Sequence, residues 1–174
     1  MKIRLNIIFF FIIPFFVLLL FYFGLSNNNR YDTRNLIGKE INFLPINSLV
    51  GKDKIILSQL KKNQFTLINF WASWCNPCRV EHKYLLLLKK NKDLKILGIN
   101  FKDKKKNALQ FLSELGDPYY FIGKDIEGKV SVQLGVYGIP ESILINNDLK
   151  VVEKFIGPLN QTNYKKIIQL IEEQ

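Results

Sequence analysis

The chain opens with a long apolar segment that differs from everything after it. Residues 5–25 carry no charge and are apolar except for Asn6 and a few small or aromatic residues. About 20 such residues span the hydrocarbon core of a bilayer, so this segment predicts a single transmembrane helix within an N-terminal anchor over 1–28. Lys2 and Arg4 precede the apolar run, and the positive-inside rule therefore leaves the rest of the chain outside the cytoplasm.

A cleaved signal peptide is the alternative to an anchor. The small residues at Gly24 and Ser26 resemble a weak cleavage site. The apolar run is longer than the 7–15 residues usual in a signal peptide, and this length favours an uncleaved anchor. A polar, asparagine-rich tether over 29–36 follows, and residues 37–174 are predicted to form one globular domain.

The predicted domain alternates between apolar runs typical of strands and amphipathic runs typical of helices. The expected elements, in chain order, are strands at 40–46 and 54–57, a strand at 65–71, a helix at 76–90, a strand at 94–100, a helix at 104–115 with Asp103 as its N-cap, a strand at 119–122, a short helix at 130–134, a hairpin of 142–146 with 151–156, and a helix at 161–173. This order predicts an α/β fold whose central mixed sheet carries helices on both faces.

The basic charge of the chain bears on whether its partner is a nucleic acid or an anionic membrane. The net charge is +10, and it remains +8 when Lys2 and Arg4 are set aside. A basic balance suits nucleic acid or anionic lipid. The lysines are scattered apart from the run at 104–106, which favours a solvated surface, with anionic headgroups near the tether as the second reading. No nucleic-acid partner is predicted.

Both cysteines of the chain, Cys75 and Cys78, lie in the stretch W-A-S-W-C-N-P-C-R, where a predicted strand ends and a helix begins. The N–H groups and the positive dipole end of a helix N-terminus stabilise a thiolate, which is the nucleophile of disulfide exchange. Pro77 suits the first helical turn, where a missing N–H costs nothing. We expect Cys75 to be the exposed nucleophile and Cys78 the shielded, resolving thiol.

Two other roles for this cysteine pair, a structural disulfide and a zinc site, have less support from the sequence. A structural disulfide closing so short a loop contributes only roughly 2 kcal/mol. A structural zinc site needs four ligands, and the chain has two cysteines and one histidine. We therefore predict a redox dithiol, with no metal and no cofactor.

The order of elements, with W-C-x-x-C at the first strand–helix junction, resembles the thioredoxin fold over 37–173. The stretch G-V-Y-G-I-P-E at 135–141 and the stretch C-R-V-E-H at 78–82 are similar to the membrane-anchored reductases of cytochrome c maturation, the CcmG/DsbE family. The stretches at 100–103 and 114–119 look like the insert of that family. The resemblance implies a thioredoxin-like domain with an N-terminal β-hairpin extension.

The resemblance also implies parts of the site. The peptide bond before Pro140 is expected to be cis and to face the cysteines, so that the backbone of Ile139 presents hydrogen-bonding groups to an extended substrate. An ordinary turn is the alternative for Pro140. Trp74 is expected to pack beside Cys75 and to shape the contact surface, and Trp71 to belong to the core.

One difference from thioredoxins concerns the acid that transfers protons to and from the cysteines. The strand position that holds a buried aspartate in thioredoxins is Asn69 here, which cannot titrate. Glu81, one helical turn after Cys78, and Glu141, directly after the proline, are therefore the candidate acids for proton transfer. A solvated surface position is the alternative for each. His82 is expected on the surface of its helix.

The function implied by the resemblance is thiol–disulfide exchange at a bacterial inner membrane, by a single-pass protein with its domain on the periplasmic side. The implied substrates are the disulfides of apocytochrome c or of another thiol protein of cytochrome c maturation. A membrane thiol reductase is the expected electron donor. The alternatives are a general periplasmic disulfide reductase or oxidase, and a membrane-tethered binding module whose dithiol is incidental.

Overall fold

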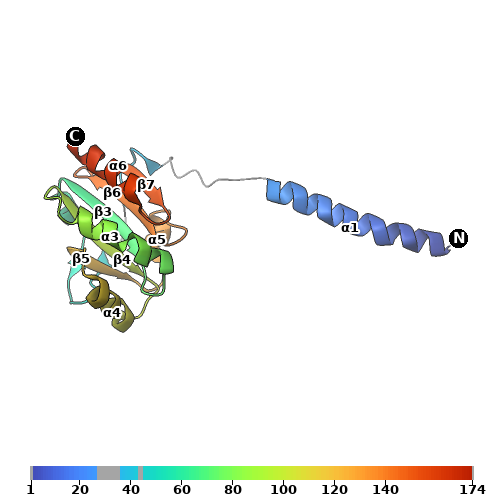
Figure 1. The fold of residues 1–174 in the computed structure, drawn as a ribbon, viewed down its shortest axis with the longest axis horizontal. Helices are drawn as coiled ribbons and strands as arrows, with labels where there is room; N and C mark the ends of the chain where they lie inside the picture. The colour runs from blue at the N-terminus through green and yellow to red at the C-terminus, as the bar shows by residue number, and fades with distance from the viewer. Residues whose placement is uncertain (1, 27–35, 43–44, 174) are drawn as a thin grey trace. The chain divides into compact units, whose positions relative to one another are not determined.

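The structure is a computed structural model that describes residues 2–26, 36–42 and 45–173 (Figure 1). The chain divides into two compact units, Met1–Asp32 and Thr33–Gln174. Of the predicted tether over 29–36, all but the last residue lies outside the described residues.

The first unit contains one helix, α1, which runs over Lys2–Ser26 with Pro14 inside it. Counting only residues that the structure describes, no helix is long and apolar enough to cross a membrane. The membrane span remains a prediction from the sequence.

The second unit is built from seven strands and five helices in the described part of the chain. These are β1 (Ile46–Asn47), β2 (Lys54–Ile55), α2 (Leu57–Leu60), β3 (Phe65–Trp71), α3 (Asn76–Leu88), β4 (Leu94–Phe101), α4 (Lys105–Leu115), β5 (Phe121–Asp125), α5 (Lys129–Gln133), β6 (Glu141–Asn146), β7 (Val151–Ile156) and α6 (Gln161–Glu172). The main sheet has the order β5-β4-β3-β6-β7. Strands β3, β4 and β5 are parallel, while β6 is antiparallel to both β3 and β7, so the predicted mixed sheet is confirmed.

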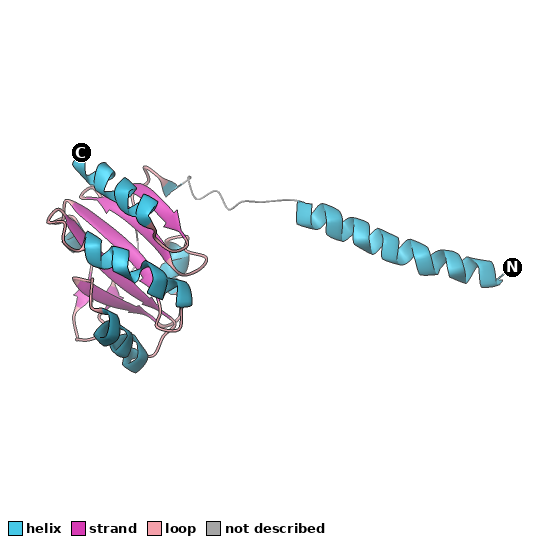
Figure 2. Ribbon diagram, viewed as in Figure 1, coloured by secondary structure: helices cyan, strands magenta, loops and turns pink. Residues whose placement is uncertain are grey.

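Strand β3 is the central strand of the sheet, between β4 and β6, and all seven of its residues are buried. Its side chains alternate between the two faces. Leu67 and Trp71 pack with apolar residues of α3, α4 and α6, whereas Ile68 and Phe70 pack with those of α2 and α5. Figure 2 shows α3 and α6 lying across the same face of the sheet. The sheet therefore has an apolar cluster on each face, and the chain passes from the carboxyl end of β3 into α3.

The N-terminal hairpin is shorter than expected, and the third parallel strand begins later in the chain than expected. Ile46 and Asn47 pair with Ile55 and Lys54 in a two-residue ladder, while residues 43 and 44 of the predicted first strand lie outside the described residues. Strand β5 begins at Phe121 rather than at Tyr119. The reason is that the Tyr119 side chain turns into the core, where its hydroxyl donates to Asn69 Oδ1 at 2.9 Å.

The prediction that Asp103 caps the helix expected at 104–115 is wrong. The N-cap of α4 is Lys104, and no side chain caps it. The Asp103 carboxylate is instead held by groups elsewhere, chiefly by Ser73 in the stretch that precedes the cysteines.

Candidate active site

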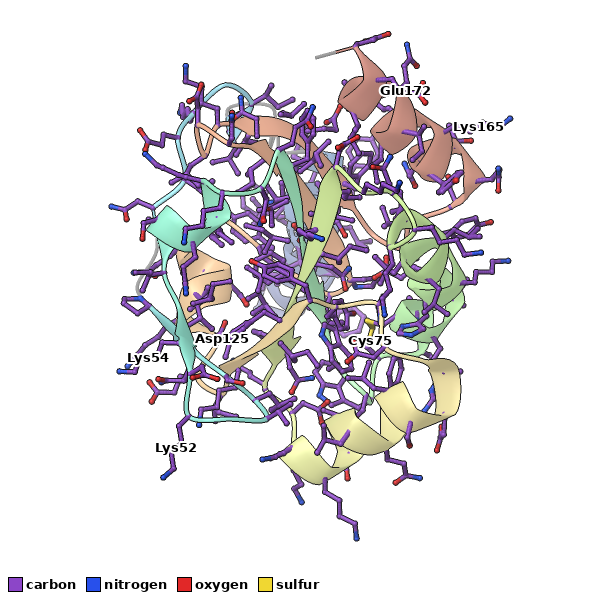
Figure 3. The ribbon with its side chains drawn as sticks, turned by 90° about the vertical axis from the view of Figure 1, so that its left-hand side faces the viewer. Lys52, Lys54, Cys75, Asp125, Lys165 and Glu172 are labelled. Carbon is purple, nitrogen blue, oxygen red and sulfur yellow. A yellow bond between two sulfur atoms is a disulfide. The ribbon has the colours of Figure 1, made fainter. Side chains whose placement is uncertain are left out.

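The two cysteines lie at the N-terminal end of α3, where the yellow sulfur atoms are visible in Figure 3. Cys75 and Cys78 are joined by a disulfide, with their Cα atoms 5.3 Å apart. Cys75 is the N-cap residue of α3, and its Sγ accepts a hydrogen bond from the backbone N–H of Cys78 at 3.2 Å. The sulfur thus occupies the position where a helix N-terminus stabilises negative charge, so this strand–helix junction can hold a thiolate.

Both sulfur-bearing residues are buried in the disulfide form. Cys75 is 4% exposed and Cys78 is 2% exposed, and both belong to the apolar cluster that includes Leu85 of α3. The expectation of an exposed Cys75 is therefore wrong for this state, because the turn that ends in Cys75 packs inward on the core. What reaches solvent beside it is Trp74, which is 58% exposed.

A groove lies next to the cysteines on the surface. It has a volume of about 480 Å³ and is lined by Asn76, Pro77, Arg79, Val80 and Pro158. Three of these residues, Asn76, Pro77 and Arg79, directly adjoin Cys75 or Cys78 in the chain, so a peptide bound in the groove would pass close to the disulfide. A second cavity, of about 450 Å³, adjoins Phe65 at the opposite end of β3 and has no part in this site.

Glu81 is the acid built into the interior beside this junction. Its side chain is completely buried, so the surface alternative for Glu81 is wrong. Its Oε1 accepts from the Asn69 side-chain amide at 2.8 Å, and its Oε2 accepts from the backbone N–H of Leu159 at 2.8 Å. Asn69 in turn donates to Ser142 Oγ at 3.0 Å and accepts from Tyr119. The Glu81 carboxylate is therefore part of a buried hydrogen-bond network that is centred on Asn69 of β3.

Burial sets the protonation of this acid. Desolvation raises the pKa of Glu81 from 4.5 to about 7, although the hydrogen bonds from Leu159 and Asn69 act in the opposite direction. A carboxyl group that titrates near neutral pH can both accept and release a proton at that pH. Burial likewise raises the pKa of Tyr119 well above 10, so Tyr119 stays a neutral donor in this chain.

Glu141 is also buried, but it is paired. Its Oε1 accepts from the backbone N–H groups of Tyr137 and Gly138, each at 3.1 Å, and its Oε2 lies 2.9 Å from Lys154 Nζ. Lys154 also donates to the carbonyl of Gly135 at 2.6 Å. The surface alternative for Glu141 is wrong as well. This carboxylate is held by a countercharge and two N–H groups, which suits it to fixing the loop rather than to carrying protons.

The loop that Glu141 fixes contains the expected cis bond, between Ile139 and Pro140. Ile139 is half-buried and packs against the cluster that contains both cysteines. The Pro140 carbonyl accepts from Gly157 N at 3.0 Å, whereas Ile139 makes no backbone hydrogen bond with any described residue. The contact of this backbone with an extended substrate, which the resemblance implies, stays a prediction.

The prediction that His82 lies on the helix surface is wrong. His82 is 3% exposed because α4 and the turn after it cover this side of α3. Its Nε2 lies 2.8 Å from the Gly116 carbonyl, and its ring packs edge-on against Phe111. Burial lowers the pKa of His82. The histidine is therefore a structural contact between α3 and α4.

An aromatic stack covers the inner side of this region. Trp71 is buried, as expected, and stacks on Tyr119 with ring centroids 5.4 Å apart. The stack crosses β4 at Gly98, where a Cβ would come within 2.8 Å of the Tyr119 ring and 2.9 Å of Trp71 Nε1. Only glycine leaves room for Tyr119 to reach Asn69.

Several residues of the site were not predicted from the sequence, namely Ser73, Asp103, Tyr119, Ser142 and Lys154. Only Lys154 leaves a local signal, because a lysine inside the apolar strand V-V-E-K-F-I requires a buried partner. The others act through partners far away in the chain. Among the described residues, no cluster of three histidine, cysteine or acidic side chains could hold a metal ion.

Comparison with known proteins places this geometry in a family. Residues 44–168 match the redoxin family. The thiol:disulfide interchange protein HelX of Rhodobacter capsulatus is 36% identical over 80% of this chain and 80% of its own length. The thiol:disulfide interchange protein CycY of Rhizobium leguminosarum bv. viciae is 49% identical over 60% of this chain, a match that spans only 56% of CycY.

A solved structure agrees with these sequence matches. The crystal structure of a thiol:disulfide interchange protein DsbE from Chlorobium tepidum superposes with a TM-score of 0.67 and 26% identity, over 79% of this chain and 96% of that one. These relatives share a thioredoxin-like fold and thiol–disulfide oxidoreductase chemistry, which fits the N-capping cysteine and its partner one turn along α3. The chain belongs to the redoxin family, among its CcmG/DsbE-type thiol:disulfide interchange proteins.

Proposed function

We propose that this oxidoreductase acts as a membrane-anchored periplasmic reductant in cytochrome c biogenesis. The observation that carries the proposal is the position of Cys75 Sγ at the N-cap of α3, which favours the thiolate and makes Cys75 the attacking sulfur. The relatives named above, all thiol:disulfide interchange proteins, support the same chemistry.

The reaction starts from the reduced dithiol. The Cys75 thiolate attacks one sulfur of the substrate disulfide, a Cys75–substrate disulfide forms, and the other substrate sulfur leaves as a thiolate that takes up a proton. Cys78 then loses its proton and attacks Cys75 Sγ, which releases the second substrate thiolate. Two electrons pass to the substrate, and the Cys75–Cys78 disulfide remains.

Glu81 is the group we assign to the proton of Cys78. It lies one turn further along α3, within the interior that also encloses Cys78, and its pKa of about 7 allows it to accept a proton at neutral pH. Glu141 is not given this role, because its charge is already matched by Lys154.

The substrate we propose is the disulfide of apocytochrome c, or of a partner thiol protein of cytochrome c maturation. The backbone of Ile139 makes no hydrogen bond with a described residue, and this backbone and the groove along Pro77 and Val80 suit an extended chain that carries its cysteines close together. The test is to mix the reduced protein with an oxidised C-x-x-C-H peptide and with an unrelated folded disulfide protein. Faster reduction of the peptide supports the proposal, and equal rates indicate a general reductase.

A cellular measurement tests the pathway. Replacing Cys75 and Cys78 together with serine is expected to lower the content of c-type cytochromes. Unchanged content would contradict the proposed role while leaving the oxidoreductase chemistry intact.

Membrane anchoring and an electron donor complete the proposal. The uncharged run at 5–25, preceded by Lys2 and Arg4, supports an anchor, and a periplasmic reductant needs electrons from across the membrane because that compartment is kept oxidising. The full chain is expected to resist extraction at alkaline pH, whereas a chain exported without residues 1–28 is released. Thiol trapping in cells that lack the membrane thiol reductase should find Cys75 and Cys78 oxidised, and an equally reduced pair would contradict this donor.

A further inference from the structure

The β4–α4 loop contributes a buried carboxylate whose partners lie in the stretch before the cysteines. Asp103 is only 7% exposed. Its Oδ2 accepts from the backbone N–H of Ser73 at 2.7 Å and from Asn100 Nδ2 at 3.1 Å. Its Oδ1 accepts from Ser73 Oγ at 2.9 Å and from the backbone N–H of Lys104 at 2.7 Å. One side chain therefore holds both the backbone and the hydroxyl of Ser73.

The same loop also holds the next residue of the chain. Trp74 donates its Nε1–H to the carbonyl of Lys102 at 3.2 Å. Lys102 has a positive φ of 44°, which turns the loop, and its N–H donates to the carbonyl of Asp125 on β5 at 3.1 Å. The two residues that precede Cys75 are thus fastened, one by a carboxylate and one by a carbonyl, to a loop that is itself bonded to the sheet.

Within this stretch the described backbone offers little support of its own. Its turn is closed by the hydrogen bond from Cys75 N to the Ala72 carbonyl, at 3.2 Å. The position of Cys75 Sγ at the N-cap of α3 consequently depends on where Ser73 and Trp74 are held. We propose that Asp103 is a positioning residue for thiol–disulfide exchange, acting through Ser73 to hold the Cys75 sulfur at the end of α3 and the exposed Trp74 beside it.

This role predicts changes that a purely structural aspartate would not cause. Without Asp103, Ser73 loses both of its acceptors and the turn gains freedom, so the Cys75 sulfur spends less time at the helix end. The thiolate is then less favoured, and a docking substrate meets a Trp74 that is no longer fixed. Both effects slow the attack by Cys75, since misplacement of a reacting group is costly in rate.

The domain supplies a matched control in Asp125. This aspartate is 4% exposed and accepts from the backbone N–H groups of Val130 and Ser131 and from Ser131 Oγ, much as Asp103 binds Ser73. It fixes the start of α5, and Figure 3 shows Asp125 well apart from Cys75. Asp125→Ala therefore removes a buried carboxylate of similar bonding, while the backbone carbonyl of Asp125 that accepts from Lys102 stays in place.

The experiment compares Asp103→Ala, Ser73→Ala and Asp125→Ala in the full chain. It measures urea unfolding, the pH dependence of Cys75 alkylation by iodoacetamide, and the rate of reaction of the reduced protein with a small aromatic disulfide. For Asp103→Ala we expect an alkylation midpoint at higher pH and a reaction about 10-fold slower. Ser73→Ala should shift both in the same direction but less, because the backbone bond to Asp103 remains.

Asp125→Ala should lose a similar amount of stability while its alkylation midpoint and its rate stay within about twofold of the parent. Equal effects of Asp103→Ala and Asp125→Ala on the rate, or an unchanged rate in Asp103→Ala, would overturn the proposal. If Asp103→Ala does not fold, Asp103→Asn and Ser73→Ala decide the matter by the same two measurements. The substrate is a small disulfide, so the outcome is independent of whether apocytochrome c is the cellular partner.

Discussion

The side-chain amide of Asn69 donates to the carboxylate of Glu81 at 2.8 Å, and neither residue is exposed to solvent. The resemblance to thioredoxins implies that Asn69 occupies the strand position where those proteins carry a buried aspartate. In this chain the amide cannot titrate, and it orients an acid that comes from α3 instead. In the mechanism we propose, the group that handles protons is therefore on the helix that carries Cys78 rather than on the strand.

Replacing Glu81 by glutamine should slow the resolving step. Glu81→Gln keeps the size of the side chain but cannot accept the Cys78 proton, so we expect the release of substrate from the Cys75 mixed disulfide to fall about 100-fold at pH 7. Rapid-quench measurements on a preformed mixed disulfide follow this step directly. Glu114→Gln is the control. Glu114 lies on α4, is exposed, and forms a surface salt bridge with Arg79 of α3. A parent-like rate in Glu81→Gln would remove Glu81 from the mechanism.

The same substitution should change how stability depends on pH. The folded-state pKa of about 7 lies above the unfolded value of 4.5, so between these values the folded protein binds more protons than the unfolded chain. The contribution of Glu81 is therefore fully present below pH 4.5 and is lost as the pH rises through 7, a change of roughly 3 kcal/mol. Urea unfolding of the oxidised parent and of Glu81→Gln at pH 4.5, 6 and 8 should show a steeper decline in the parent. Parallel curves would contradict the raised pKa.

The order of attack can be read from trapped intermediates. Cys78→Ser should accumulate mixed disulfides between Cys75 and substrate, because the resolving thiol is missing. Cys75→Ser should accumulate none, since Cys75 and not Cys78 is the N-cap residue whose sulfur accepts an N–H at the end of α3. Non-reducing gels of each variant, mixed with an oxidised peptide, distinguish the two. Trapping by Cys75→Ser instead would reverse the assigned roles.

The ion pair of Lys154 with Glu141 should matter far more than an exposed one. Lys154→Met leaves a buried carboxylate without its countercharge, and we expect a loss of about 3–5 kcal/mol in the free energy of unfolding. Lys166→Met breaks the more exposed pair with Glu153 and should cost under about 1 kcal/mol.

A double variant separates charge from packing at this pair. Adding Glu141→Gln to Lys154→Met removes the orphaned charge and should recover part of the loss. Urea unfolding of the three proteins provides the comparison. A Lys154→Met protein as stable as Lys166→Met would show that the buried pair does not hold the loop before Pro140.

Elements with long, regular patterns could be predicted closely from the sequence. Strand β3 has the expected bounds, and α3 and α6 end within two residues of the expected positions, because apolar periodicity and Pro77 mark them locally. The cysteine pair lies in one short stretch of the chain, so finding it needs no knowledge of what packs against it. The cis bond before Pro140, by contrast, is expected only because the stretch around it resembles the CcmG/DsbE family.

The errors arose where a distant segment decides the environment. His82 looks exposed on its own helix, but Phe111 and Gly116, about thirty residues later, cover it. Asp103 sits where a helix cap is expected, yet Ser73, thirty residues earlier, offers its carboxylate two better-placed donors. Neither partner leaves a trace in the local sequence. Tertiary competition for one side chain therefore limited the prediction of the site.

The contact of Glu81 with the backbone N–H of Leu159 spans 78 residues, and that of Asn69 with Ser142 spans 73. Contacts of such long range form only after most of the chain is available, and their loop closure slows folding. A chain emerging N-terminus first on the far side of a membrane would carry its cysteines well before it carried Leu159. During that interval the Glu81 carboxylate would lack the N–H of Leu159, although Asn69 is already present, and α3 would have no cover from α6. If the chain is exported as we propose, its thiols would stay open to oxidants until the residues of α6 arrive and cover α3.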